Sequence, residues 1–142
     1  MNQGKALLTS VLNTTQMGQI GIRSVLDTHI PLNLRRAMVS QLKEYDKIES
    51  EAKSIANSRG WHLKEVNPAV RKMSDMVTKT RLSYGDRPSK IAAMMIQGNT
   101  RGMIIGIKDR RNTNCKDDAV CTLAQKLLDT EESNIRQMQG FL

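Results

Sequence analysis

Apolar residues recur at steps of three and four along most of the chain, which is the spacing of amphipathic helices rather than of strands. The pattern predicts long helices over about residues 4–27, 33–58, 89–111 and from 117 or 118 to 139. A shorter helix is expected over about 68–82, because Asn67 is a good N-cap and Pro68 suits the first helical turn. The sequence therefore predicts an all-α protein.

The spacing of these segments predicts how they are connected. A short segment around His29-Ile30-Pro31 separates the first two long helices, and a polar loop over 112–116 separates the last two. Residues 60–88 are much longer, and we expect them to cross the outside of the molecule with the short helix inside them. Residues 1–142 then form a single domain, an antiparallel four-helix bundle with a crossover segment at about 60–88.

The composition agrees with helices and excludes several classes. The chain has 142 residues, of which 39% are apolar but only 3% aromatic, whereas strands favour aromatic residues. No apolar run is long enough to span a membrane, and no basic start followed by an apolar block marks a signal peptide. Cys115 and Cys121 show no metal-ligand pattern. We expect reduced cysteines, a cytoplasmic location and no contact with a membrane.

Charge is distributed unevenly along the chain. The formal net charge is +8, and residues 59–111 alone contain 12 Lys/Arg against 4 Asp/Glu, which is also +8. A basic region of this kind either meets nucleic acid or an acidic partner, or is a solvated helix surface. No nucleic-acid-binding motif accompanies it, so we favour the solvated surface.

Polar residues interrupt three of the four apolar stripes near the middle of each helix. The interruptions are Gln19, Gln97, and Glu131 with Asn134, and Tyr45 lies on the stripe of the second helix. A buried amide without a partner costs about 1–3 kcal/mol, so we expect these side chains to bond one another inside the bundle. The alternative is a groove or solvent-facing position, which would mark a small-molecule site.

Helix order and these polar positions resemble the ferritin-like superfamily, and in particular its uncharacterised bacterial members. Di-iron bundles of that superfamily take a Glu from each of two helices and a Glu-x-x-His from each of the other two. Gln19 and Gln97 stand where single glutamates are expected, and Glu131-x-x-Asn134 stands where the last Glu-x-x-His is expected. The resemblance implies a ferritin-like bundle with a degenerate di-metal site.

The departures from that pattern predict that the metal centre is lost. Two metal ions need several carboxylates and imidazoles, whereas glutamine is neutral. The chain has only His29 and His62, and neither lies three residues after an acid. We also find no nucleophile paired with a base and no phosphate-binding glycine loop. We therefore predict no metal, no cofactor and no enzymatic activity.

Glycines inside the predicted helices need a structural reason, since each costs about 1 kcal/mol relative to alanine. One interpretation is close approach of neighbouring helices, and the other is a cleft in which a ligand lies against bare backbone. We favour close packing. The residues concerned are Gly18, Gly21, Gly98, Gly102 and Gly106.

Three hypotheses for function follow. The first is a non-catalytic bundle that acts by association, with itself, most simply as a dimer, or with a partner protein. The second is a basic bundle that associates with nucleic acid, like the DNA-protecting members of the ferritin superfamily. The third is a degenerate di-iron oxidase or iron-binding protein, which the missing histidines disfavour.

Overall fold

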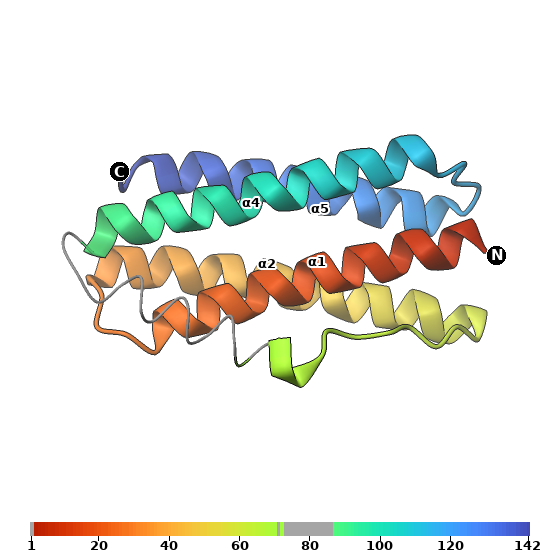
Figure 1. Cartoon of the computed structure of the whole chain (residues 1–142), viewed down its shortest axis with the longest axis horizontal. Coiled ribbons are helices and arrows are strands. Elements are labelled where there is room, and N and C mark those ends of the chain that lie inside the picture. Colours follow the sequence, from red (N-terminus) through yellow and green to blue (C-terminus); the bar gives the residue numbers. More distant parts are fainter. Residues whose placement is uncertain (1, 71, 73–86) are drawn as a thin grey trace.

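Four long helices form the protein, and they pack as an antiparallel bundle (Figure 1). The computed structural model describes residues 2–70, 72 and 87–142. Within them α1 spans Gln3–Leu26, α2 Leu32–Arg59, α4 Arg87–Asn112 and α5 Asp118–Gln139. The predicted all-α fold is confirmed, and the observed bounds differ from the predicted ones by one or two residues.

Local sequence signals explain where several of the helices begin and end. Asn2 caps α1, its side chain accepting a hydrogen bond from the backbone N–H of Lys5 at 3.2 Å. Asp117 caps α5 in the same way through the N–H of Val120. Gly60 ends α2 in the left-handed conformation, with φ of 69°, which glycine adopts without strain.

The helices assemble as two pairs, α1 with α2 and α4 with α5, and α1 also contacts α4 and α5. Their apolar stripes meet along the axis of the bundle, where Leu8, Ile22, Leu34, Met38 and Ile48 are almost completely buried. The described helices are too polar to cross a membrane.

The connection after α2 runs back along the α1–α2 pair (Figure 1). The side-chain amide of Asn13 donates to the carbonyl of Lys64 at 3.2 Å, and the N–H of Val66 donates to Gln16 at 3.0 Å. Residues 68–70 and 72 are helical, as predicted for the start of the short helix. The remainder of the predicted 68–82 helix lies outside the described residues.

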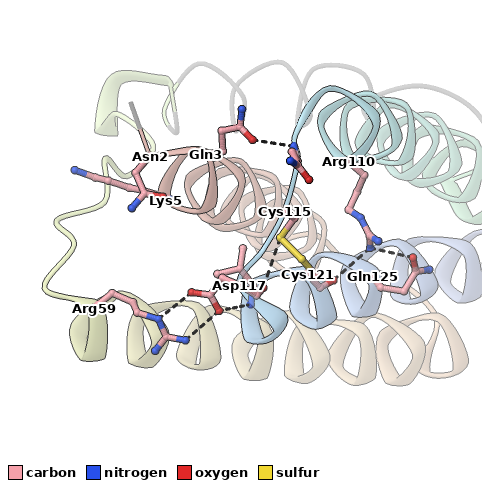
Figure 2. The surroundings of a disulfide bond; sticks show 11 residues. Asn2, Gln3, Lys5, Arg59, Arg110, Cys115, Asp117, Cys121 and Gln125 are labelled. Carbon is pink, nitrogen blue, oxygen red and sulfur yellow. Dashed lines mark hydrogen bonds and ion pairs between the residues drawn. A yellow bond between two sulfur atoms is a disulfide. The ribbon is translucent and has the colours of Figure 1, made fainter.

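The two cysteines are joined, which corrects the prediction that they are reduced. A disulfide links Cys115 in the α4–α5 loop to Cys121 in the first turn of α5 (Figure 2). The signal that sequence reasoning missed is the position of the pair, at a loop and the following helix turn. Next to it, Asp117 accepts two hydrogen bonds from the guanidinium of Arg59, at 2.9 and 3.0 Å, which tie this end of α5 to the end of α2.

Removing this disulfide should destabilise the fold. The bond closes a loop between residues with a sequence separation of 6, and so restricts the conformations of the unfolded chain. Without it the unfolded chain gains entropy, and the free energy of unfolding should decrease by about 2 kcal/mol. The test is urea denaturation of the Cys115→Ser/Cys121→Ser variant, with and without reductant. Reductant should weaken the wild type and leave the variant unchanged. A wild type that is insensitive to reductant would contradict the prediction.

Candidate functional site

A hydrogen-bonded group of four polar side chains lies in the middle of the bundle, and we call it the central cluster (Tyr45, Asn99, Glu131 and Asn134). The hydroxyl of Tyr45 lies 2.7 Å from Oε1 of Glu131 and 3.0 Å from Oδ1 of Asn99. Asn134 donates to the same hydroxyl from 3.3 Å. All four residues are buried. The cluster therefore joins α2, α4 and α5 through one phenol.

Two glycines make room for this cluster. A Cβ at Gly18 would lie 2.7 Å from the ring of Tyr45, and a Cβ at Gly102 would lie 3.1 Å from Oε2 of Glu131. Because real Cβ atoms do not approach so closely to a buried ring, α1 reaches the Tyr45 ring only through a glycine. These contacts explain why glycine stands inside two helices, where its low helix propensity is a cost.

Burial controls the electrostatics of the cluster. Removal from water raises the pKa of Glu131 from its ordinary value of 4.5 to about 7, and the hydrogen bond from Tyr45 opposes this rise. None of the ion pairs among the described residues involves Glu131. The pKa of Tyr45 is raised by burial and then by the neighbouring Glu131.

The structure brings together three of the five residues predicted for the polar core: Tyr45, Glu131 and Asn134. The prediction for Gln97 is wrong, because its side chain is exposed and Asn99 takes the inward position. The inward face of α4 carries Asn99 and Gly102 beyond Met95, while Ile104 and Ile105 are exposed. A stripe chosen by hydrophobicity therefore selects the wrong face in this half of the helix.

Gln19 is buried as predicted, but it belongs to a different group of residues. Its amide donates to Asp46 at 2.8 Å and to Glu49 at 3.4 Å, both on α2. Gln16, one turn earlier, donates to Glu49 and, at 2.8 Å, to Glu65 in the connection after α2. Two buried glutamines of α1 thus hold α2 and the connection in place, and they do not contribute to the central cluster.

The five glycines also divide into two groups. Gly18, Gly102 and Gly106 each lie against a side chain of another helix, with Leu128 facing Gly106 at 2.8 Å. Gly21 and Gly98 have nothing within 4 Å of an added Cβ, so the prediction of close packing is wrong for these two. The helix surface at both positions is open.

The donor set of the central cluster does not fit two metal ions. It offers one carboxylate, a phenol and two amides, which neither balance the charge of two cations nor provide imidazole. His29 lies between α1 and α2 and His62 follows α2, so α2 separates them, and both are exposed. No group of three acidic, histidine or cysteine side chains suited to a metal occurs among the described residues.

A second candidate place is an open hollow of about 850 Å³ at the end of the bundle that carries the disulfide. Arg59, Trp61, Lys116 and Asp117 are among the residues that line it, and Figure 2 shows Arg59 and Asp117 side by side. The charges of Arg59 and Asp117 are paired with each other at 2.9 Å. This ion pair ties the end of α2 to the start of α5 at the edge of the hollow.

Comparison with known proteins supports the fold. The structure is similar to a DUF305 fragment from Deinococcus radiodurans, with a TM-score of 0.77 and 13% sequence identity over 99% of this chain and 95% of that chain. No protein-family model and no curated protein matches the sequence. At this level of identity the similarity shows a shared helical fold alone.

Alanine substitutions at Gly18 and Gly98 should change the free energy of unfolding in opposite directions. Gly18→Ala places a methyl group against the buried ring of Tyr45, and overpacking of this kind costs about 1–3 kcal/mol. Gly98→Ala meets nothing within 4 Å and should stabilise the helix by about 0.4–1 kcal/mol. Chemical denaturation of both variants measures the difference. Equal effects at the two positions would show that Gly18 is not a packing contact.

Proposed function

We propose that this protein is a ferritin-like bundle whose di-metal site is degenerate, and that it acts by binding a partner protein rather than by catalysis. The hydrogen bonds of the central cluster support this proposal, because the only buried carboxylate there, Glu131, is engaged by Tyr45 and lacks the acidic neighbours that a metal pair requires.

The observation that carries the binding proposal is the surface of α4. Ile104, Ile105 and Ile107 are 51%, 41% and 38% exposed, which is unusual for three large aliphatic side chains in four positions of one helix. Arg101, Lys108 and Arg111 are exposed nearby, and no ion pair among the described residues includes them. We call this surface the outer face of α4 (Arg101, Ile104, Ile105, Ile107, Lys108 and Arg111).

The chemistry of this face favours an acidic protein surface with apolar groups. Arg101, Ile104, Lys108 and Arg111 follow one another at steps of three and four, so they share one side of the helix. Pairing of two α4 helices in a dimer would bring these cations together, and like charges at close range oppose association. Nucleic acid would satisfy the cations but would leave the isoleucines facing phosphate groups.

We further propose that the protein works in an oxidising compartment rather than in the predicted cytoplasm. Disulfides persist in oxidising environments and are rare where thiols are kept reduced. The Cys115–Cys121 bond supports this assignment. Alkylation of the protein as isolated from intact cells, followed by mass spectrometry, tests it directly.

The purified protein should fail to bind iron in stoichiometric amounts. Its central cluster presents a single carboxylate, and the histidines lie elsewhere on the surface. Titration with Fe(II) under anaerobic conditions, followed by exposure to oxygen, measures both binding and oxidation. Saturable binding of two ions per chain with ferroxidase activity would contradict the proposed degenerate site.

Charge reversal on the outer face of α4 should weaken binding to an acidic, partly apolar peptide. The probe is a fluorescent helical peptide made of glutamate and leucine, and the readout is anisotropy at physiological salt. We expect Arg101→Glu/Lys108→Glu to lower the affinity at least tenfold, because two attractive contacts become repulsive. Ile104→Ser should reduce binding to this peptide but leave binding to an all-glutamate peptide unchanged.

The matched control is Lys43→Glu, at an exposed cation on α2 that belongs to none of the ion pairs among the described residues. It should change the affinity by less than twofold. Light scattering and a titration with duplex DNA separate the other hypotheses. A stable dimer that Ile104→Ser disrupts would favour self-association, and tighter binding of DNA than of the peptide would favour nucleic acid.

A further inference from the structure

The central cluster contains more acceptors than a single phenol can serve. The hydroxyl of Tyr45 has one proton to donate and can accept two hydrogen bonds. It lies within hydrogen-bond distance of two oxygen atoms, Oε1 of Glu131 at 2.7 Å and Oδ1 of Asn99 at 3.0 Å. In this orientation of its amide, Asn99 also has Nδ2 buried without a partner. If Glu131 is ionised, both oxygens are pure acceptors and one of them must remain without a proton.

A proton on Glu131 resolves this conflict. The carboxylic acid then donates to the phenol oxygen, the phenol donates to Asn99, and the amide of Asn134 donates to the phenol oxygen from 3.3 Å. Each of the three hydrogen bonds at the Tyr45 hydroxyl then has one proton between its two heavy atoms. The phenol donates one of these bonds and accepts the other two, which is its full capacity. No charge remains in the core.

We propose that Glu131 is a proton-binding site in the centre of the bundle, and that loss of this proton loosens the contact of α5 with α2 and α4. The bound proton completes the hydrogen bonds of Tyr45. Its departure leaves a negative charge that is buried among neutral groups and an oxygen of Asn99 without a donor. Burial of an unpaired charge is costly, so the folded state gains by keeping the proton.

Among the residues that the structure describes, none in contact with Glu131 would stabilise its ionised form by charge. From α2 it faces Tyr45, and from α4 it faces Asn99 through the phenol and the bare backbone of Gly102. On the α1 side the Gly102–Glu131 contact is bordered by Thr14, which does not titrate. Asn134 is the neighbour on α5 itself. The high pKa of Glu131, about 7, agrees with this neutral environment.

The dependence of stability on pH follows from the sign of this shift. Between about 4.5 and about 7 the folded chain holds the proton and the unfolded chain does not. The contribution of Glu131 to the free energy of unfolding is therefore largest below about pH 4.5. It falls as the pH rises towards about 7 and is constant above that pH. The folding equilibrium constant should decrease by up to tenfold per pH unit within that window.

Two measurements test the site. In the wild type, the ¹³C resonance of the Glu131 carboxyl should titrate with a midpoint near 7, which requires no variant to fold. Tyr45→Phe removes the hydroxyl that bonds the Glu131 carboxyl at 2.7 Å, so the midpoint should shift away from its wild-type value. A midpoint near the ordinary value of 4.5, or a midpoint that Tyr45→Phe does not move, would overturn the proposal.

Denaturation as a function of pH supplies the second measurement. Glu131→Gln keeps a neutral side chain of similar shape, so it should abolish the loss of stability between pH 4.5 and 7 and slow amide exchange in the middle of α4 at pH 8. The matched control is Glu132→Gln, the adjacent exposed residue, which should retain the wild-type pH profile. Identical profiles for wild type and Glu131→Gln would overturn the proposed site, including the case in which the Asn99 amide is turned over and Glu131 stays ionised.

Discussion

The packing of one tyrosine against a glycine holds the two halves of this bundle in register. The ring of Tyr45 occupies the space that Gly18 leaves on α1, while its hydroxyl reaches Asn99 on α4 and Glu131 on α5. Aliphatic contacts along the rest of the axis tolerate sliding and rotation, since any similar side chain can fill the same volume. A phenol with three polar partners has one acceptable position, so it specifies which helix faces which.

The same constraint explains why this centre is unsuited to the chemistry of a di-iron bundle. In such a bundle several carboxylates lie close together because cations balance their charge. Here one carboxylate is left among amides and a phenol, and its burial favours the neutral acid rather than a metal ligand. The further carboxylates of this region, Asp46 and Glu49, bond the glutamines of α1 on the outer side of the α1–α2 pair instead.

Helix periodicity was sufficient to predict the number and length of the long helices, because apolar residues recur at steps of three and four along each of them. It was also sufficient for Tyr45, which lies on the apolar stripe of α2, and for Glu131 and Asn134, which interrupt the stripe of α5. It failed on α4, where the buried positions after Met95 are Asn99 and Gly102 and the isoleucines are exposed. When the polar side of a helix faces the core, hydrophobicity alone predicts the wrong buried face. The disulfide could not be predicted from the cysteine spacing alone, because the pairing depends on how the α4–α5 loop meets the first turn of α5.

The same rotation of α4 that buries Asn99 also exposes the isoleucines of its C-terminal half. The C-terminal half of α4 gains little from apolar burial, and it is held by polar contacts: Ser10 to Asp109, and Arg110 to the carbonyl of Cys121 at 3.3 Å. Burying one isoleucine completely is worth about 1.5–3 kcal/mol. A partner that covers Ile104 and its neighbours would therefore add the apolar burial that this half of α4 lacks within the chain. After Met95, α4 presents isoleucines outward and Asn99 inward, so this part of the helix depends on polar contacts with its neighbours. The proton on Glu131 therefore matters most for the helix that carries the proposed binding face.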